Sequence, residues 1–348
     1  MSRWVFVAAI CASVLATTGA EACSRALYHG EDGAHVTVRS MDWRNRLHTD
    51  LWAFPRGLER SGAVGDRSLS WTSRYGSVVA SAFGAATVDG LNEEGLAANL
   101  LYLTGSEYPD LTAREGDAIA VSAWAQYMLD MFATVEDAVA AMRADPLLVA
   151  TGMTPDGMAA TVHLSLSDAT GDSAVIEFID GEMVIHHSRD YRVMTNEPAF
   201  DTQLTLNEYW RSFDGTEVLP GTNKPVDRFV RASFYIDAIP RTADADEAVT
   251  NALSVIRNVS VPRGISTPDR PNISSTLWRI AADHKSGRYF FDSATRPNVF
   301  WVDLSGLDFS EGAPSRKLDV ADGTPHAGEV SGSFAAAEPY AFLPADAP

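Results

Sequence analysis

The sequence is almost free of cysteine. Of its 348 residues only Cys11 and Cys23 are cysteines, and Cys11 lies in an apolar run near the amino terminus. Removal of that run would leave a single cysteine, so no disulfide inside the remaining chain could hold the fold together. A cysteine left over in an exported protein is usually either a free reactive thiol or one half of an intermolecular bridge.

Positive charge is also scarce. The chain has 27 lysines and arginines against 46 aspartates and glutamates, which gives a formal net charge of −19 at pH 7. Proteins bind nucleic acids and anionic membrane surfaces through basic patches, so this balance argues against both as partners. An acidic excess is more typical of a protein that stays soluble after export.

The common hydrolase and nucleotide-binding motifs are missing as well, because there is no G-x-S-x-G turn and no P-loop. The eight histidines form no cluster in the sequence. His186 and His187 are adjacent on an expected strand, where successive side chains point to opposite faces, so they cannot both bind one metal ion. We therefore expect a reaction that needs no metal and no cofactor.

The long apolar run spans residues 4–16 and follows Arg3. Small and polar residues come next and end in Ala20-Glu21-Ala22, an A-x-A pattern of the kind that signal peptidase cuts. We interpret residues 1–22 as a signal peptide and expect a periplasmic or secreted protein. Cys23 would then be the first residue of the mature chain.

Two alternatives to a cleaved signal peptide stay open. An uncleaved anchor is one, although the run is shorter than the roughly 20 residues of a membrane-spanning helix. A lipoprotein signal is the other, because a cysteine follows the cut, but Glu21 fits that signal poorly.

Past the signal peptide the sequence is rich in strand patterns. Strands are expected over residues 24–28, 35–41, 71–83, 97–103, 161–167, 174–179, 181–187, 275–282, 288–291 and 299–304, with turns at 30–33, 89–92 and 168–171. Helices are expected over residues 119–132, 226–239 and 243–256, and another begins at Thr134, with Asp137 completing a capping box. Runs of strands separated by helical pairs indicate an α+β fold.

The carboxyl-terminal residues 312–348 are rich in proline, alanine, glycine and aspartate. This composition predicts an extended tail. No internal repeat and no linker divides the rest of the mature chain, so residues 23–311 are expected to form one domain.

A thiol on the first residue of a chain has its own base. The α-amino group titrates at about pH 8, so it can take the thiol proton directly or through one water. Such a nucleophile also needs a cation that favours the thiolate, an anion that holds the amine, and donors for the oxyanion. Arg39 and Asp42, on the strand returning towards Cys23, offer the cation and the anion. Taken alone, this pair is more typical of an ordinary salt bridge at a strand end.

Five sequence blocks together resemble a known family. Residues 23–27 (Cys-Ser-Arg-Ala-Leu) and 38–43 (Val-Arg-Ser-Met-Asp-Trp) resemble the start of the choloylglycine hydrolases and penicillin V acylases, which are N-terminal nucleophile (Ntn) hydrolases. The resemblance continues at residues 89–96, 194–200 and 227–231, in the family's order and approximate spacing. It implies an αββα sandwich of two antiparallel sheets between helices, and hydrolysis of linear amide C–N bonds.

The resemblance also implies roles for the residues around the thiol. Cys23 would be the nucleophile, with its own α-amino group as the base. Arg39 would favour the thiolate, Asp42 would orient the α-amino group, and Arg228 would complete the charge network. Asn196 would donate its side-chain amide to the oxyanion.

The second oxyanion donor would be the backbone N–H of Tyr102, ten residues beyond Asn92. Bile-salt hydrolases resemble one another in having Asn at this position, whereas acylases that prefer penicillin V have Tyr. Trp43 resembles the Gram-negative branch of those acylases, a branch that also acts on N-acyl homoserine lactones. With Met41, these residues would supply a flat apolar pocket for an aromatic or fatty acyl group.

Three alternatives remain beside this interpretation. Trp43 could serve only to pack the core. The enzyme could be a bile-salt hydrolase, which Tyr102 disfavours, or the chain could be a non-catalytic, lipid-anchored periplasmic protein. The stretch between Asn196 and Arg228 is also shorter than in Gram-positive members, where it includes a loop that helps assemble the tetramer. A homo-oligomer is therefore expected, but the tetramer is in doubt.

Overall fold

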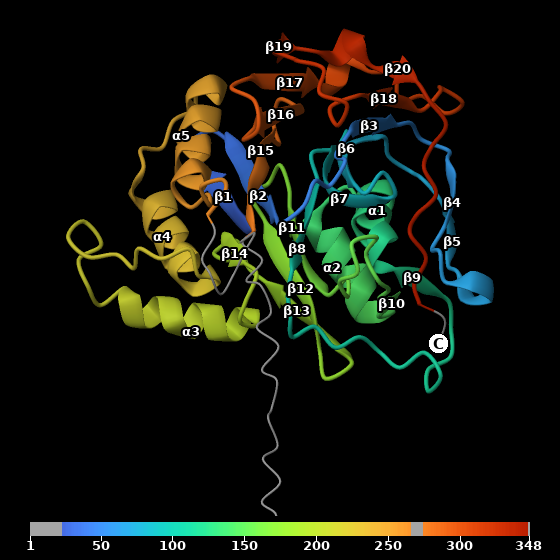
Figure 1. Ribbon diagram of the computed structural model, residues 1–348, viewed down its shortest axis with the longest axis horizontal. Coiled ribbons are helices and arrows are strands. Elements are labelled where there is room, and N and C mark those ends of the chain that lie inside the picture. Colours follow the sequence, from blue (N-terminus) through green and yellow to red (C-terminus); the bar gives the residue numbers. More distant parts are fainter. Residues whose placement is uncertain (1–22, 266–273, 347–348) are drawn as a thin grey trace, which may run out of the picture.

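Figure 1 shows the computed structural model of the chain, which describes residues 23–265 and 274–346. The expected signal peptide lies outside the described residues, so its cleavage stays a prediction. In the part of the chain that the structure describes, no helix is long and apolar enough to cross a membrane.

The first of two large sheets contains the strand that follows Cys23. Its seven strands run in the order β14-β1-β2-β15-β16-β17-β19, and only β17 and β19 pair in parallel. Their bounds are β1 Ser24–His29, β2 His35–Trp43, β14 Val193–Thr195, β15 Ser275–Asp283, β16 Arg288–Ser293, β17 Val299–Asp303 and β19 Gly328–Glu329.

The second large sheet has nine strands, in the order β13-β12-β11-β8-β7-β6-β3-β18-β20. Their bounds are β3 Leu51–Phe54, β6 Ser77–Ala82, β7 Ala86–Asn92, β8 Ala97–Tyr102, β11 Val162–Ser167, β12 Ser173–Ile179, β13 Glu182–His187, β18 Arg316–Leu318 and β20 Ala335–Ala336. Two small sheets accompany it, made by β4 Glu59–Ser61 with β5 Ser70–Thr72 and by β9 Ala118–Ala120 with β10 Leu148–Ala150.

Helices cover the outer face of each large sheet (Figure 1). On the first sheet, α4 (Pro225–Ala238) packs against β1, and α5 (Ala245–Asn258) packs against β1 and β2. On the second sheet, α1 (Val121–Met131) packs against β7 and β8, and α2 (Val135–Ala144) packs against β12. The fold is therefore α+β, as the strand and helix patterns predict, and it is the αββα sandwich that the family resemblance implies.

The strand β2 lies in the middle of these layers. All nine of its residues are buried, because one face packs against the second sheet and the other against α5. Five of its buried side chains are nevertheless polar: His35, Thr37, Arg39, Ser40 and Asp42. Burying polar and charged groups is costly unless they find partners, so this strand is where a functional site is expected.

Most of the expected elements are present, but residues 89–92 do not form a turn. They end β7, and the turn follows at residues 93–95. The side chain of Asp89 accepts hydrogen bonds from Tyr289 and Asn99, and the Asn92 amide donates to the carbonyls of Leu129 and Phe132. These tertiary partners satisfy polar side chains that the sequence alone assigns to a turn.

Three further elements differ from the expectation. The strand expected over residues 71–83 is split into β5 and β6, because the backbone N–H groups of Arg74 and Tyr75 both donate to the carbonyl of Asp130. The helix expected from residue 119 begins at Val121, because residues 118–120 pair with β10. The helix α3 (Phe200–Trp210) was not predicted, since its apolar residues have only weak helical periodicity.

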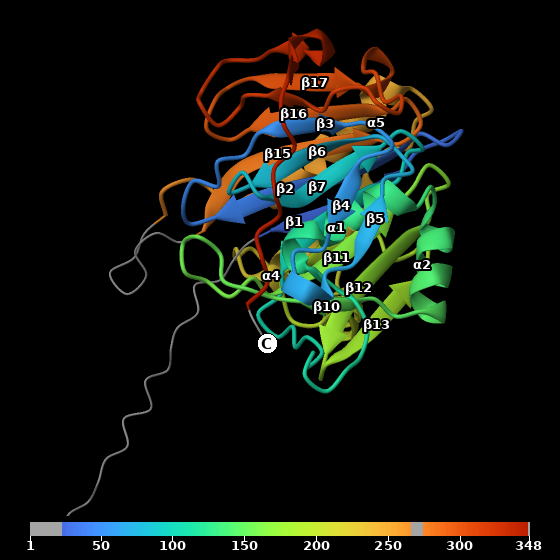
Figure 2. The same cartoon turned by 90° about the vertical axis from the view of Figure 1, so that its right-hand side faces the viewer.

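Residues 312–346 are mostly extended, but they pack on the domain. Strand β18 pairs with β3, and β20 pairs with β18, so this segment completes one edge of the second sheet. The chain then runs down the side of the molecule past β4 and β5 and ends near β10 (Figure 2). Phe342 in this last stretch is buried in the core under the second sheet. The residues after 312 are therefore packed on the domain and do not form a separate unit.

The Thr134 cap at the start of α2 is confirmed, because its hydroxyl accepts from the Asp137 N–H, and the Asp137 carboxylate accepts from the same hydroxyl. Thr134→Ala is expected to lower the free energy of unfolding by about 1 kcal/mol, the usual cost of a lost helix cap. Chemical denaturation measures this change. Thr205→Ala, at an exposed position inside α3, is the matched control and should cost clearly less. Equal losses in the two variants would contradict the capping role.

Candidate active site

The pairing of β1 with β2 decides what surrounds Cys23. Ser24 lies opposite Ser40 and Arg25 opposite Arg39, so the residue before β1 lies next to the end of β2. The Cys23 Sγ is 3.9 Å from the Met41 Sδ and 3.4 Å from the Asp42 backbone nitrogen. A hairpin expected from the sequence therefore places the thiol against the segment that carries the expected site residues.

Two groups near the sulfur favour its thiolate form. The Asp42 N–H donates to Sγ, and the Arg39 Nη2 lies 4.0 Å from it. A donor and a cation at these positions stabilise negative charge on sulfur. The thiolate, rather than the thiol, is the nucleophilic form of cysteine.

Arg39 is fully buried and is held by contacts on several sides. Its Nη2 donates to the carbonyl of Leu100 at 2.7 Å, and its guanidinium lies 4.8 Å from the ring centre of Trp278. The carboxylate of Asp89 lies 3.9 Å from its Nε. Burial raises the pKa of Asp89 to about 6, against the opposing effect of Arg39. Asp89 is thus the counter-ion that anchors Arg39 beside the thiol.

Asp42 is equally buried, at the end of β2. Its Oδ2 accepts from the Ser40 hydroxyl, and its Oδ1 has no hydrogen-bond partner among the described residues. Burial raises its pKa to about 6, although the charge of Arg228 and the hydroxyls of Thr276 and Ser40 act in the opposite direction. A buried carboxylate oxygen without a partner is costly, which fits a position where a further donor is expected.

Asn196 and Tyr102 lie side by side although they come from different sheets. The Asn196 amide donates to the Tyr102 carbonyl at 2.9 Å. The Leu103 N–H donates to the Thr161 carbonyl of the neighbouring strand. Hydrogen-bonded and non-hydrogen-bonded pairs alternate along an antiparallel ladder, so the next pair, Tyr102 with Val162, is non-hydrogen-bonded. The Tyr102 N–H and C=O both point away from β11, towards Asn196. The Tyr102 N–H and the Asn196 amide therefore lie on the same side of β8.

Arg228 connects these groups from helix α4. Its Nη2 donates to the Asn196 Oδ1 at 3.0 Å, which orients the amide so that its nitrogen faces Tyr102. Its Nη1 donates to the Cys23 carbonyl at 2.6 Å and to the Ser24 hydroxyl. Burial lowers the pKa of Arg228 to about 10, so the side chain remains charged at neutral pH. One arginine thus ties the thiol residue to the donor pair.

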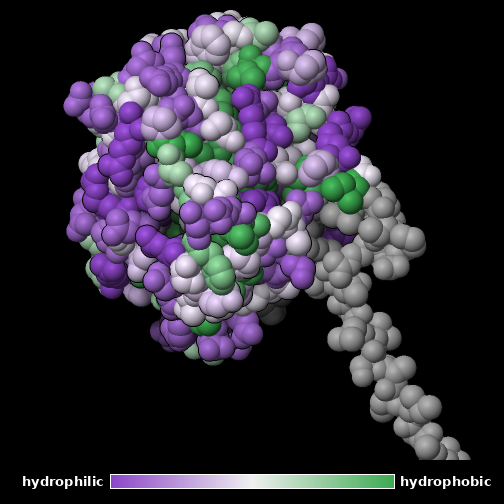
Figure 3. Space-filling model, turned by 90° about the vertical axis from the view of Figure 1, so that its left-hand side faces the viewer, coloured by the Kyte–Doolittle hydropathy of each residue, from purple (hydrophilic) through white to green (hydrophobic). Residues whose placement is uncertain are grey.

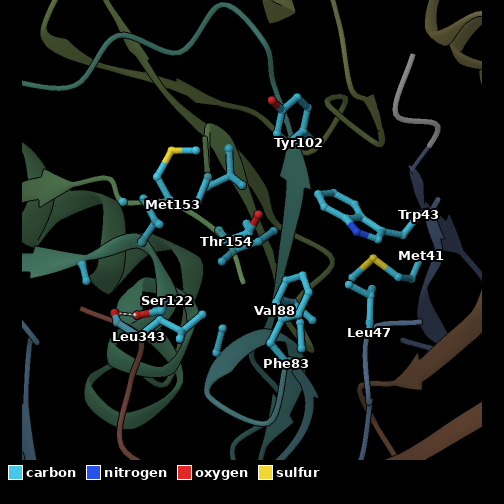
Figure 4. A pocket seen from close by; sticks show the side chains of 18 of the residues that line it. Met41, Trp43, Leu47, Phe83, Val88, Tyr102, Ser122, Met153, Thr154 and Leu343 are labelled. Carbon is cyan, nitrogen blue, oxygen red and sulfur yellow. Dashed lines mark hydrogen bonds between the residues drawn. The ribbon is translucent and has the colours of Figure 1, made fainter. Parts of the chain in front are cut away.

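A cavity opens beside the thiol, and the space within it and its open mouth together amounts to about 790 Å³. Its lining is almost entirely apolar. Trp43 contacts Tyr102 and Phe83 edge to face, at ring-centre distances of 6.0 and 6.3 Å. Figure 4 shows Met41, Trp43 and Leu47 on one side of the cavity and Met153, Ser122 and Leu343 on the other.

Trp43 both packs in the core and lines the cavity, the two positions that the sequence left open. It belongs to the hydrophobic core, with only 7% of its surface exposed, and it also lines the cavity. Its indole N–H donates to the Asp156 carboxylate at 2.8 Å, which holds the loop after β10 against the cavity. Packing and substrate contact are therefore compatible for this side chain.

Several residues near the cavity were not found from the sequence: Asp89, Asp156, Leu343 and Pro344. The signal for Asp89 was a charged residue within an apolar strand pattern. The others carry no local signal, because they reach the cavity from loops distant in sequence.

The histidines take no part in this site. His187 contacts Asp172 at 2.7 Å and His186 contacts Glu177 at 3.4 Å, so the two neighbours have separate partners. Among the described residues, one group has metal-ligand spacing: Glu136, Asp172 and His187. It includes none of the residues around Cys23.

We expect Arg39→Met to make the thiol of the mature protein less reactive. Removing a cation 4.0 Å away raises the pH of half-maximal alkylation by about one unit or more. This pH is measured from the rates of iodoacetamide alkylation over a range of roughly pH 5 to 10.

The control for this experiment is Arg39→Met with Asp89→Asn, which removes both members of the buried pair and leaves no unpaired carboxylate. The double variant should fold and show the same shift. An unshifted alkylation profile in both variants would contradict the role of Arg39.

Comparisons with known proteins identify the family of this chain. The sequence matches the family of linear amide C–N hydrolases, choloylglycine hydrolase family, over residues 23–315. It is 50% identical over 347 residues to a penicillin V acylase of Pectobacterium atrosepticum, covering 92% of each chain. A bile salt hydrolase/transferase of Clostridium perfringens is 22% identical over 321 residues, covering 83% of this chain and 95% of that protein.

Solved structures share the fold. A penicillin V acylase from Agrobacterium tumefaciens superposes with a TM-score of 0.86 at 52% identity, covering 92% of this chain and all of the other. A conjugated bile acid hydrolase variant from Clostridium perfringens gives a TM-score of 0.74 at 20% identity, covering 85% of this chain and 97% of the other, which shows the fold alone. The chain belongs to the choloylglycine hydrolase family and is a hydrolase of linear amide C–N bonds.

Proposed function

We propose that the mature enzyme hydrolyses penicillin V and N-acyl homoserine lactones, with Cys23 as the nucleophile. The observation that carries this proposal is the placement of the thiol at one side of an apolar cavity lined by Met41, Trp43 and Tyr102. Such a cavity accepts the aromatic or fatty acyl group of these amides. The similarity to penicillin V acylases supports the first of the two substrates.

The proposed reaction begins when the α-amino group of Cys23 takes the thiol proton. The thiolate attacks the amide carbonyl, and the oxyanion accepts hydrogen bonds from the Asn196 amide and the Tyr102 N–H. The ammonium group then gives its proton to the leaving amine as the C–N bond breaks. Water attacks the acyl-thioester, with the α-amino group again as the base, and releases the carboxylic acid.

This mechanism requires cleavage after Ala22, and we propose that the protein is exported and processed there. The Oδ1 of Asp42 has no hydrogen-bond partner among the described residues, and the Asp42 backbone contacts the Cys23 sulfur, which supports a role for Asp42 as acceptor for the newly formed α-amino group. A periplasmic or secreted acylase acting on acyl homoserine lactones would remove bacterial signals outside the cytoplasm, which is quorum quenching.

Self-association also belongs to the proposal. The stretch between Asn196 and Arg228 includes α3 and exposes large apolar side chains at Tyr209, Phe213 and Val218. It lies on a face that is otherwise largely hydrophilic (Figure 3). Light scattering on the mature protein tests for a homo-oligomer and shows whether it is the family's tetramer.

A substrate panel on the processed enzyme tests the proposed activity. Penicillin V and acyl homoserine lactones should be hydrolysed, and Cys23→Ala should abolish turnover of both without changing the melting temperature. A variant that keeps a Met before Cys23 should also be inactive, because its α-amino group is displaced. Full turnover by either variant would overturn the mechanism.

The same panel separates the alternatives. Faster hydrolysis of glycine-conjugated bile salts than of either proposed substrate would make the protein a bile-salt hydrolase. The intact mass of the exported protein reports on its amino terminus. An unmodified Cys23 supports the enzyme, whereas a diacylglyceryl adduct indicates a lipid anchor.

The pH dependence of the reaction should report on Asp42. The carboxylate must be charged to hold the ammonium group, and its pKa is about 6 before processing. Activity is therefore expected to fall as the pH falls. The fall should occur at or below this value, because the positive charge of the new ammonium group lowers the pKa of Asp42. Asp42→Asn should lower kcat/KM at pH 8 by about 100-fold or more. Profiles of kcat/KM against pH measure both effects.

Stability provides the control for this variant. Before processing, the folded-state pKa of Asp42 lies above its ordinary 3.8, so the carboxyl group stabilises the unprocessed fold most at low pH, and this contribution is lost as the pH rises through about 6. Asp42→Asn should therefore not unfold the unprocessed protein at pH 8. A variant with full activity and an unchanged pH profile would contradict the assigned role.

A further inference from the structure

The carboxyl-terminal segment, residues 339–346, reaches the cavity beside the thiol. Leu343 and Pro344 line this cavity together with Ser122 and Met153. In Figure 4, Leu343 and Ser122 lie across the cavity from Met41 and Trp43. Since Met41 contacts the Cys23 sulfur, the terminal segment forms the wall remote from the reacting bond.

Backbone hydrogen bonds hold this wall in place. The Leu343 N–H donates to Ala85 at 2.9 Å, and the Leu343 carbonyl accepts from the Ser122 hydroxyl at 2.6 Å. The N–H groups of Ala345 and Asp346 donate to Ala63 and Thr151, each at 3.0 Å. Both sides of Leu343 are thus tied to the domain, and its side chain has a fixed position.

Buried aromatic residues anchor the same segment further back. Phe342 stacks on Trp71, with ring planes 23° apart, and Tyr340 contacts the rings of Trp52 and Phe54. The Tyr340 hydroxyl is bonded to that of Thr87, and burial raises the pKa of Tyr340 well above its usual range. Phe342 and Tyr340 therefore pack against the core, while the residues between and after them are partly exposed, although the segment follows a region of low-complexity composition.

Gly152 provides the space for the segment to pass. A Cβ atom at this position would lie 2.8 Å from the Pro344 carbonyl oxygen and 3.1 Å from the Asp346 nitrogen. Real Cβ atoms rarely come so close to backbone atoms, so any other residue would push the segment away. The close approach of two backbones, rather than a special backbone conformation, is the reason for glycine here.

The part of the chain that matches the family ends at residue 315, before this segment begins. We propose that residues 339–346 set the length limit of the acyl group, with Leu343 as the stop at the far end of the cavity. This inference rests on the proposed function for its substrate, an amide with an aromatic or fatty acyl group. The segment would then determine specificity without taking part in the chemistry.

The test compares acyl homoserine lactones of graded chain length on the mature enzyme. Leu343→Ala should raise the ratio of kcat/KM for long over short chains by about tenfold, because a methylene in an apolar pocket contributes at least that much discrimination. Leu343→Trp should change the ratio in the opposite direction. Ala341→Ser, at an exposed position of the same segment, is the control and should leave it unchanged.

A second pair of variants tests the segment without altering its side chains. Gly152→Ala should displace it, broaden the chain-length profile and speed cleavage of the terminal segment by a non-specific protease. Gly105→Ala is the matched control, since a Cβ there meets no atom within 4 Å. An unchanged chain-length profile in folded Leu343→Ala and Leu343→Trp would overturn the proposal.

Binding to Cys23→Ala distinguishes failure of this inference from failure of the proposed function. Free carboxylic acids of graded length are titrated while tryptophan fluorescence is followed, so no turnover is needed. Leu343→Ala in the Cys23→Ala background should shift the preferred length upward. A shift without hydrolysis of any panel substrate would contradict the proposed function alone, and turnover without a shift would contradict the length limit alone.

Discussion

The antiparallel pairing of β1 with β2 is the constraint on which the rest of the site depends. Its register places Cys23 beside Met41 and Asp42. Arg39 lies two residues before Met41 on β2, so its side chain is on the same face of the strand. Because both strands are buried between a sheet and helices, their polar side chains must find partners inside the protein. The functional groups are therefore held by the same contacts that satisfy the buried strands.

The charges around the thiol form an alternating series. Asp89 anchors Arg39, Arg39 faces the sulfur, and Arg228 lies near Asp42 and binds the Cys23 carbonyl. Burial raises the pKa of both aspartates to about 6, so each depends on a cation to remain charged. Replacing one member leaves a buried charge without its partner, which is costly. Reactivity and stability are thus coupled through one network.

Substrate contact is arranged differently from the chemistry. The groups around the thiol lie on or beside β1 and β2 and on helix α4. The cavity is lined partly by strand residues, such as Met41 and Tyr102, and partly by the loop after β10 and the carboxyl-terminal segment. The loop and terminal parts of this wall can change in shape while the strands keep Cys23 in position. One family can therefore keep one reaction and vary the amide that it accepts.

The sequence by itself determined the α+β class, most strands and helices, and the residues that the structure brings together at Cys23. It could do so because strand alternation and cap residues are local, and because a single cysteine behind an A-x-A pattern is distinctive. The turn expected at residues 89–92 was wrong, because the polar partners that keep Asp89 and Asn92 inside a strand lie far along the chain.

Only the tertiary structure decided the rest. It alone paired Asp89 with Arg39, brought Asn196 to the Tyr102 backbone, and packed Tyr340 and Phe342 against the core under the second sheet. No local pattern encodes these contacts, because each joins segments that are distant in sequence and meets only when the two sheets stack. For the same reason, composition predicted an extended tail but could not predict that Leu343 lines the cavity across from Met41 and Trp43.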